Sequence, residues 1–212
     1  WILFILLFAM AVRVPLDTDT WWHLRSGQEI LDKGKIPTSD EFSHTLRGED
    51  WIDQSWLAQI ALYGSYKLTG GNGDPADTGT IGLALFTAIL ATAGMARIYR
   101  MGAGTVYSKM FVVVIGAATA AIFWTPRPQM FSFLLSTIVL YLLPLYKYKQ
   151  VDRLWLIPVM MILWANLHAG FAIGFIYLFG FLGGEAVGNL LDKNDAYAVN
   201  WKHLQKVGLI TL

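Results

Sequence analysis

Long apolar runs, separated by short polar segments, dominate the chain. A helix needs about 20 residues to cross the hydrocarbon core of a bilayer. Runs close to that length predict five transmembrane helices, over residues 80–98, 107–124, 128–146, 154–168 and 169–191. No segment shows the strict alternation that predicts a strand. The predicted fold class is therefore all-α, a polytopic transmembrane helix bundle.

Both ends of the chain are also apolar. Residues 1–14 begin with WILFILLFAMAV and lack the basic start and the small-residue cleavage site of a signal peptide. We interpret them as the end of a first transmembrane helix, and VGLITL at 207–212 as the start of a last helix that is cut short. The predicted organisation is the end of helix one at 1–14, an extracytoplasmic loop at 15–79, and helices two to seven at 80–212.

Composition supports a membrane protein and excludes other classes. Hydrophobic residues make up 55% of the chain and charged residues 15%, against about 45–50% and about 25% in average soluble domains. These values exclude a soluble globular enzyme. The net charge of +1 comes with no basic stripe that follows phosphates, so a nucleic-acid partner is excluded as well. The chain has no cysteine, which excludes disulfides, thiolate zinc sites and cysteine nucleophiles.

Basic residues gather in three of the segments that connect the predicted spans. Cytoplasmic loops of membrane proteins carry an excess of Lys and Arg, so we expect these segments to face the cytoplasm. Residues 15–79, the turn at 125–127 and the turn at 166–170 then lie on the extracytoplasmic face. The basic residues concerned are Arg97, Arg100, Lys109, Lys147, Lys149, Arg153, Lys193, Lys202 and Lys206.

The span predicted over 154–168 is short. Its 15 residues cover roughly 22 Å as a helix, against a hydrocarbon core of about 30 Å. We expect its exit at 166–168 to lie below the outer surface, where polar backbone requires a protein-lined or wet cavity. The alternative is a tight helix hairpin assisted by glycine.

The predicted outer loop, residues 15–79, holds 11 of the 15 acidic residues of the chain. Within it, residues 20–33 (TWWHLRSGQEILDK) predict a helix that ends at Gly34. Residues 55–68 predict a second helix, with Ser55 as a candidate cap and apolar residues along one face. We expect both helices to be interfacial, lying flat on the membrane surface. A merely solvated loop is the alternative explanation of the acidic composition.

Asp17 and Asp19 follow the first span directly, in the motif PLDTDTWW. Residues two apart in an extended chain point to opposite sides, so both face one ligand only where the backbone turns. One inward carboxylate can act as a general base, and a kinked pair can hold a divalent cation. A phosphatase-type D-x-D-x-T nucleophile is rejected, because that motif needs a parallel sheet. The alternative is that one aspartate, more readily Asp19, caps the following helix.

These features together resemble the N-terminal part of a GT-C glycosyltransferase, a polytopic enzyme that transfers a sugar from a polyprenyl-phosphate carrier on the outer face of the membrane. The similarity lies in a first helix that runs into the acidic motif LDTDTWWHL (16–24), in the long outer loop with two helices, and in closely connected spans. The segments WIDQSWL (51–57), TPRPQMFSF (125–133) and WANLHAGF (164–171) also resemble stretches of uncharacterised bacterial membrane proteins usually placed near this group.

The resemblance implies a lipid-linked sugar donor, a place in the bacterial cytoplasmic membrane, and a catalytic carboxylate on Asp17 or Asp19, in an order that stays open. Some members carry further acids in the second outer loop, where this sequence has only TPRPQ (125–129). That departure argues against a metal site of their type and leaves open a metal-free inverting transfer.

Arg127 and His168 are predicted on the same face of the membrane as the acidic motif. Arg127, between two prolines, offers a planar guanidinium for the carrier phosphate; its alternative is contact with lipid head groups. His168 can donate to phosphate or relay a proton; its alternative is a histidine satisfied by a neighbouring helix.

Four more residues of the outer loop are predicted to bind substrate. His23 and Trp22 belong to the acidic motif, while Trp51 and Asp53 precede the second loop helix. Aromatic faces suit pyranose rings, so Trp51, Asp53 and Trp56 predict a sugar-stacking edge. An aromatic belt that anchors the loop at the membrane surface is the alternative.

Glu185 is the single acidic residue within a predicted span, in GFLGGEAVG. Intramembrane carboxylates are functional candidates by default. The alternative is a bond to a neighbouring helix, and Gly183, Gly184 and Gly188 suggest close helix packing at this point.

Two other functions remain alternatives to the glycosyltransferase. A transporter would line a path through the membrane with polar residues, whereas here they gather on one face and only Glu185 interrupts a span. A catalytically silent structural subunit would keep the same architecture, with Asp17 and Asp19 capping helices and facing water.

Overall fold

The computed structural model describes residues 1–74, 76–192 and 197–211. Within these ranges the ordered elements are helices, and a single isolated bridge joins Ser39 to Asp50. The predicted all-α fold class is confirmed. The elements are α1 (Ile2–Ala11), α2 (Asp19–Lys33), α3 (Trp56–Leu68), α4 (Gly79–Met101), α5 (Val106–Ala120), η1 (Ala121–Phe123), α6 (Gln129–Lys149), α7 (Leu156–Leu167), η2 (Ala169–Phe171), α8 (Ala172–Leu191) and α9 (Trp201–Thr211).

Four helical segments of the described chain are long and apolar enough to cross a membrane. They are α4, α5 with its extension η1, α6, and η2 with α8. Each begins and ends within three residues of a predicted span. The chain is therefore consistent with an integral membrane protein.

Helix α7 is shorter than the span predicted over 154–168. Before it, the carboxylate of Asp152 accepts the N–H of Leu154 at 3.2 Å. After it, His168 has extended backbone (φ −166°, ψ 141°), and its ring accepts the N–H of Gly170 at 3.0 Å. A Cβ on Gly170 would clash with Ser132 and with the His168 ring. The connection from α7 to α8 is thus the tight, glycine-assisted hairpin that the sequence offered as an alternative.

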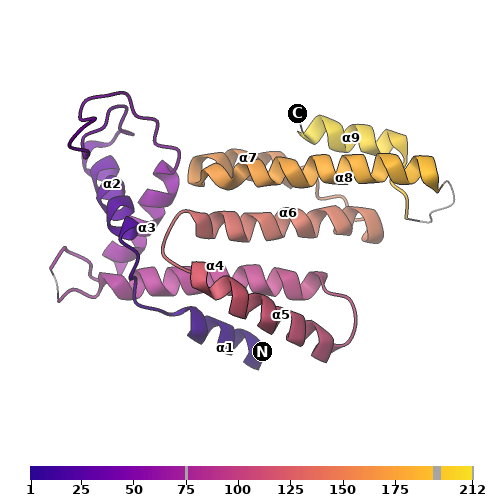
Figure 1. Ribbon diagram of the computed structural model, residues 1–212, viewed down its shortest axis with the longest axis horizontal. Coiled ribbons are helices and arrows are strands. Elements are labelled where there is room, and N and C mark those ends of the chain that lie inside the picture. Colours follow the sequence, from indigo (N-terminus) through magenta and orange to yellow (C-terminus); the bar gives the residue numbers. More distant parts are fainter. Residues whose placement is uncertain (75, 193–196, 212) are drawn as a thin grey trace.

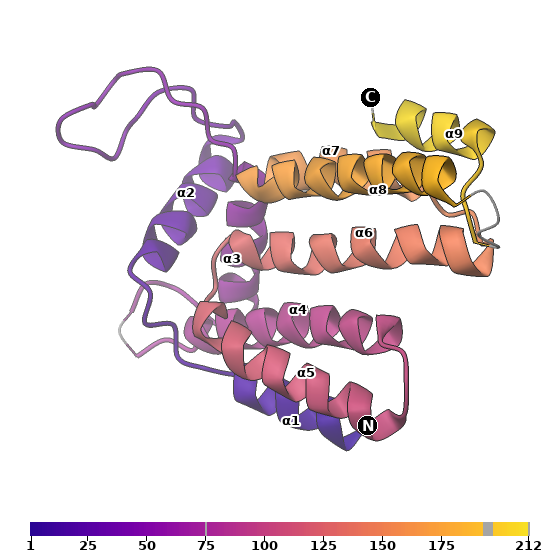
Figure 2. The same cartoon turned by 45° about the vertical axis from the view of Figure 1, so that its right-hand side comes forward.

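Figure 1 shows α4, α6 and α8 side by side, with α2 and α3 at one end of the bundle and the N-terminus toward the other. We call the first end, with residues 12–79, 121–128 and 168–171, the acidic end. The second, with the connections from α4 to α5 and from α6 to α7, is the basic end. Figure 2 shows the loop between α2 and α3 projecting beyond the acidic end. Lys193 of the predicted basic segments and Leu212 of the predicted last helix lie outside the described residues.

Apolar side chains of the described residues form three clusters. The first joins α6, α7, α8 and α9, the second joins α1, α4 and α5, and the third joins α2 and α3 to α4. Because the third cluster fixes α2 and α3 on the bundle, the acidic motif at the start of α2 has a set position. Members of the clusters in turn include Val139, Trp164 and Leu178; Leu7, Ala91 and Val113; and Leu24, Leu62 and Leu83.

The two predicted helices of the outer loop are present as α2 and α3. They pack closely where Gly27 meets the carbonyl of Gln59, since a Cβ on Gly27 would clash with it. Ser55 precedes α3, but its side chain makes no capping hydrogen bond. Instead the carboxylate of Asp53 accepts the N–H of Ser55 at 3.1 Å. Asp53, rather than Ser55, therefore supports the start of α3.

The last helix begins earlier than predicted. Helix α9 starts at Trp201, and it buries Leu204, Val207 and Thr211 at helical spacing on one face. It packs against α7 and α8, and Lys206 pairs with an aspartate ahead of α7. Over the described residues 207–211 the apolar run belongs to this amphipathic helix, whose polar beginning hydropathy alone missed.

The glycine-rich end of α8 is not a site of close packing, contrary to prediction. A Cβ added to Gly183, Gly184 or Gly188 would meet no atom within 4 Å. By contrast, a Cβ on Gly174 would clash with Met161 of α7. Close approach of α8 to α7 therefore occurs near its start, since the later glycines face away from the described helices.

Candidate functional site

Asp17, Asp19 and Arg127 form an ion cluster at the acidic end of the bundle. Arg127 Nη1 lies 3.2 Å from Asp17 Oδ2, and Arg127 Nη2 donates to Asp19 Oδ2. The aspartates follow α1, whereas Arg127 lies in the turn before α6. The cluster therefore joins segments that are 110 and 108 residues apart in the chain.

A turn of the backbone at Thr18 lets both carboxylates reach the same guanidinium. Thr18 has helical rather than extended torsions (φ −63°, ψ −30°). Asp17 Oδ1 then accepts the N–H of Asp19 at 3.0 Å, which satisfies an amide that has no partner within α2. The capping role expected of Asp19 thus falls to Asp17.

The two carboxylates of the cluster differ in how many of their oxygens have a hydrogen-bond partner. Asp17 is 20% exposed and uses both oxygens, one on the Asp19 amide and one on Arg127. Asp19 is 49% exposed, and its Oδ1 has no hydrogen-bond partner among the described residues. Asp19 is therefore the carboxylate of this pair that has an oxygen open to a ligand.

Arg127 is neutralised by this arrangement. Both of its terminal nitrogens are engaged by carboxylates, and the cluster of one cation with two anions has a formal charge of −1. A phosphate that approached Arg127 would have to displace an aspartate or meet net negative charge. The geometry thus gives Arg127 the task of orienting Asp17 and Asp19, beside the phosphate-binding role that the sequence suggested.

His23 lies one turn along α2 from Asp19 and belongs to the same electrostatic group. Burial and, after it, the positive charge of Arg127 lower the pKa of His23 from 6.5 to about 4. The carboxylates of Asp19 and Asp17 oppose this shift, and His168 adds to it. His23 is therefore uncharged at neutral pH, with one ring nitrogen that donates and one that accepts a hydrogen bond.

His168 has a defined tautomer. Its Nδ1 accepts the N–H of Gly170 at 3.0 Å and lies 2.7 Å from the hydroxyl of Ser132. Ser132 in turn accepts the indole N–H of Trp164 at 2.6 Å. Because an amide N–H can only donate, Nδ1 is an acceptor and the proton resides on Nε2. His168 Nε2–H has no partner among the described residues and is available as a donor.

A divalent cation at the two aspartates does not fit this arrangement. The guanidinium already bridges the carboxylates and supplies the positive charge, whereas Ca²⁺ and Mg²⁺ need about six oxygen ligands. In the part of the chain that the structure describes, no group of three or more His, Asp or Glu side chains is placed to hold a metal. A cation that bridged the two aspartates would therefore have to displace the guanidinium of Arg127 from their Oδ2 atoms.

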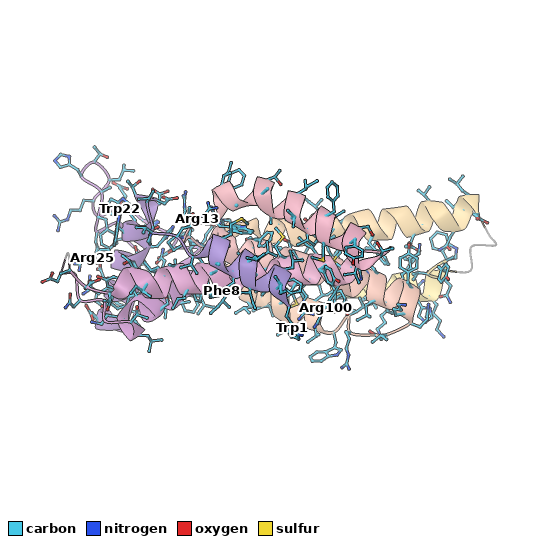
Figure 3. The ribbon with its side chains drawn as sticks, turned by 90° about the horizontal axis from the view of Figure 1, so that it is seen from below. Trp1, Phe8, Arg13, Trp22, Arg25 and Arg100 are labelled. Atoms are coloured by element: carbon cyan, nitrogen blue, oxygen red, sulfur yellow. The ribbon has the colours of Figure 1, made fainter. Side chains whose placement is uncertain are left out.

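A cavity of about 230 Å³ lies beside the ion cluster, between the end of α1, α4 and η1. Arg13 and Asp17 line it, and Figure 3 shows Arg13 at the end of α1 that leads into the acidic end. The Arg13 guanidinium donates to the carbonyls of Met10 at 2.9 Å and Ala121 at 3.1 Å. It pairs with no carboxylate among the described residues, so its charge is not neutralised.

Three residues that line this cavity each have a buried polar atom without a hydrogen-bond partner in the described structure. These atoms are the hydroxyls of Thr87 and Thr125 and the indole N–H of Trp124. Thr87 is 2% exposed and Trp124 is 4% exposed. An unsatisfied buried donor costs about 1–3 kcal/mol, so each of these atoms would be stabilised by a hydrogen-bond partner. The sequence offered one signal for this cavity, since Arg13 is the single charge in residues 1–14.

Trp22 and Trp51 lie apart from the cavity, on either side of Phe42. Their rings meet Phe42 edge to face, with centroids 5.7 Å and 6.0 Å away. This row of rings fastens the loop between α2 and α3 onto α2. Both tryptophans therefore contact Phe42, within residues 15–79, and not the ion cluster.

Asp53 also has a local role. It is 8% exposed and accepts hydrogen bonds from the Ser55 amide and the Gln59 side chain, at 3.1 Å and 3.0 Å. Burial raises the pKa of its carboxyl. Close by in the chain, Trp56 donates to Asn166 at 2.9 Å, which links α3 to the end of α7. Asp53 thus positions α3 and contacts no member of the ion cluster.

Glu185 forms a second ion cluster, at the basic end. Lys147 of α6 donates to Glu185 Oε1, and the amide of Val199 donates to Oε2 at 3.2 Å. The side chains of Lys147 and Glu185 are 15% and 10% exposed. Both oxygens of Glu185 are used, so the predicted alternative of a bond to a neighbouring helix is confirmed.

Comparison with known proteins adds no family to this description. The chain matches no protein-family model, no curated protein and no solved structure. What the protein does is therefore inferred from the chemistry of its own side chains, of which Asp17, Asp19, Arg127, His23 and His168 form one electrostatic group.

Proposed function

We propose that the protein is a membrane glycosyltransferase that transfers a sugar from a polyprenyl-phosphate carrier to an acceptor hydroxyl. The observation that carries this proposal is the half-exposed Asp19 carboxylate, which Arg127 orients and which keeps one unpaired oxygen. The unpaired donors of the adjacent cavity are a complementary feature. A base and an anion-binding cavity side by side are what this transfer requires.

The cavity beside Asp17 suits the carrier phosphate. Its unpaired groups include an indole N–H and two hydroxyls, all of which can donate. Arg13 adds the guanidinium N–H groups that are not used on carbonyls, and charge-assisted bonds to phosphate are among the strongest. The apolar side chains of Val14 and Ile122 in the same lining suit a lipid chain. We therefore assign the phosphate to Arg13 in preference to the neutralised Arg127.

In the proposed reaction, the acceptor hydroxyl oxygen attacks the anomeric carbon of the donor sugar. The bond from that carbon to the phosphate oxygen breaks, and its electron pair leaves with the carrier phosphate. The hydroxyl proton passes to Asp19 Oδ1. Attack from the side opposite the leaving group inverts the anomeric configuration. A positioned base contributes about 10²–10⁴-fold to such a step.

The two histidines support this chemistry as hydrogen-bonding groups. His23 carries no charge at neutral pH. His168 Nε2–H is a free donor, suited to a sugar hydroxyl or a phosphate oxygen. His23 is neutral, so it adds no cation that would compete with Arg127 for the aspartates. Both are binding residues in this proposal, whereas Asp17 and Arg127 are positioning residues.

We also propose that the acidic end faces the outside of a bacterial cytoplasmic membrane, with α2 and α3 on its outer surface. The basic residues near the opposite end support this orientation through the positive-inside rule. The chain has no cysteine, so single cysteines report sidedness directly. A membrane-impermeant maleimide should label His44→Cys in intact cells and label Ala103→Cys only after permeabilisation. The reverse pattern would contradict the orientation.

The transfer itself is tested with a radiolabelled polyprenyl-phosphate sugar and the full chain in nanodiscs. Asp19→Asn should lower kcat by about 10²–10⁴-fold with little change in KM, because only the base is lost. Asp17→Asn should have a smaller effect, since Asp17 acts through Arg127 and the Asp19 amide. Asp32→Asn, on the same helix but outside the cluster, is the matched control. Full transfer by Asp19→Asn would overturn the assignment of the base, and no transfer by the wild type would favour a silent subunit.

A further inference from the structure

A second cavity, of about 420 Å³, lies on the side of α2 that faces away from the ion cluster. Residues of an α-helix are about 100° apart around its axis. Asp19 and His23 therefore share one face of α2, whereas Trp21, Arg25 and Gln28 share the opposite one. These three line the cavity with residues of α3 and of the segment between α3 and α4. The cavity is thus separate from the proposed transfer site.

Aromatic rings form one wall of this cavity. Tyr63 and Tyr66 lie nearly parallel, with centroids 6.4 Å apart and planes inclined by 29°. Trp21, which is 48% exposed, adds an indole to the same lining. A Cβ on Gly71 or Gly79 would clash with the Tyr66 ring, so the close approach of backbone there depends on glycine. The Tyr66 ring is thus fixed in place by packing against the backbone of Gly71 and Gly79.

The opposite part of the cavity is polar and partly preorganised. Asp77 Oδ2 accepts the amides of Asn72 and Gly73, at 2.9 Å and 3.0 Å, and the hydroxyl of Tyr66. These bonds lower the pKa of Asp77 to about 2, so the carboxylate stays ionised. The side-chain amide N–H₂ of Asn72 and the ammonium of Lys67 have no partner among the described residues. Asp77 Oδ1 accepts the amide of Gly79 at 3.0 Å, so the acceptor that remains for a ligand is Oδ2 of the neighbouring lining residue Asp74, whose Oδ1 accepts the amide of Ala76.

The charge of the lining distinguishes between classes of ligand. Arg25 and Lys67 are cationic, and Asp74 and Asp77 are anionic, so their charges cancel. A phosphate or carboxylate site would show an excess of donors and positive charge, as the cavity beside Arg13 does. A neutral ligand that has hydroxyls around its edge and C–H groups on its face matches both the balanced polar groups and the aromatic wall.

From this combination we infer that the cavity between α2 and α3 binds a neutral saccharide, with its ring against Trp21 and Tyr63 and its hydroxyls on Asn72, Arg25 and Asp74. Each amphipathic ring of the wall covers apolar sugar surface while the rim remains wet. The volume of about 420 Å³ lies within the range of small-ligand sites, about 300–1,000 Å³. Binding here is expected whether or not the chain transfers sugars.

The test uses the full chain in nanodiscs free of glycosidic detergents, because the sugar head groups of such detergents would compete. The labelled nanodiscs are applied to an array of short oligosaccharides built from hexose and N-acetylhexosamine units, with sulfated and sialylated counterparts. We expect binding to at least one neutral oligosaccharide. Binding to none, or to anionic members alone, would overturn the inference.

Variants then assign the binding to this cavity. Trp21→Ala and Tyr63→Ala should each raise the dissociation constant at least about tenfold, which corresponds to about 1.4 kcal/mol of binding free energy. Trp155→Ala, an exposed tryptophan outside the cavity, is the matched control and should bind as the wild type does. Arg25→Gln, a polar exchange at an exposed position, provides a second variant if either alanine variant unfolds early. Unchanged binding in folded Trp21→Ala or Arg25→Gln would contradict the site.

The outcome is separable from that of the proposed transfer reaction. Asp19→Asn should bind the same oligosaccharide with wild-type strength, because its carboxylate lies on the other face of α2. Loss of binding in Asp19→Asn would show that the two sites are one and would overturn the separate saccharide site. Loss of transfer with retained binding would leave this inference intact.

Discussion

The acidic end and the basic end each have an ion cluster of one or two carboxylates and a cationic side chain. The two clusters differ in whether a carboxylate oxygen is left without a hydrogen-bond partner. At the acidic end, Asp19 is half exposed and keeps one oxygen without a partner. At the basic end, Glu185 is 10% exposed, and both of its oxygens accept hydrogen bonds. The first cluster has a group that is available to a substrate, whereas the second is saturated by the protein itself.

This difference teaches how to separate a site from a structural tie in a membrane protein. An ionisable residue within a span is a functional candidate by default, and Glu185 met that criterion in the sequence. Its contacts with Lys147 and the Val199 amide give it a structural role, because no atom remains for a ligand. Asp19 is therefore the candidate functional carboxylate because it is exposed and has an oxygen without a hydrogen-bond partner among the described residues. Charge within the membrane alone does not identify it.

The largest effect is expected on stability at the basic end. Glu185→Gln removes the carboxylate that accepts from Lys147, and breaking a buried pair costs about 3–5 kcal/mol. The thermal unfolding midpoint in nanodiscs should fall markedly, while the transfer activity of the folded fraction is retained. The double variant Glu185→Gln with Lys147→Met should recover much of the loss, since it replaces both charged members of the buried pair. A single variant as stable as the wild type would remove the distinction between the clusters.

At the acidic end the main effect should be on transfer. Arg127→Gln leaves two carboxylates facing each other without a cation, so one of them takes up a proton or turns away. Loss of an orienting charged group should lower kcat by about 10²–10³-fold, comparable to the loss of one preorganised donor. Initial rates with the radiolabelled donor measure this, and Arg47→Gln, at an exposed position of the loop between α2 and α3, is the control. A rate within a few fold of the wild type would show that Arg127 is a structural tie as well.

A smaller effect is expected from pH, through His23. Its pKa is about 4 in the folded protein and about 6.5 in an unfolded chain, so the unfolded state binds the proton first on acidification. Stability is therefore full above about pH 6.5 and falls as the pH drops toward 4, with about 1 kcal/mol lost at pH 5.5. Unfolding midpoints measured across this range should fall less steeply for His23→Gln. Parallel profiles for the variant and the wild type would rule out His23 as the cause.

The smallest effect is predicted for the hydrogen bonds behind His168. Ser132→Ala removes one partner of Nδ1, but the Gly170 amide still donates to it at 3.0 Å. The Nε2–H tautomer should persist, and transfer should fall only a few fold, within the net contribution of about 1 kcal/mol for one hydrogen bond. Nitrogen-15 chemical shifts of the imidazole report the tautomer directly. A switch to Nδ1–H would contradict the role given to Gly170.

The sequence predicted the helices well because the signals for them are local. The apolar runs of α4, α5, α6 and α8 are as long as a membrane-spanning helix, and Gly34 ends α2 with a positive φ of 64°, as expected of a helix stop. The prediction was poorer for α9, because its first turns are polar and only one face is buried. It was wrong for the glycines of α8, since small residues permit close packing but do not supply a partner helix.

The candidate site divides in the same way between local and long-range causes. Sequence alone determined that Asp17 and Asp19 follow α1 and that Arg127 lies in a turn at the same end of the alternating helices. Only the tertiary structure decided that Arg127 is shared by both carboxylates, because the contact spans 110 residues and depends on the turn at Thr18. The cavity beside Arg13 was likewise beyond the sequence. Its unpaired atoms come from α4 and from the chain around η1, and only packing brings them to one place.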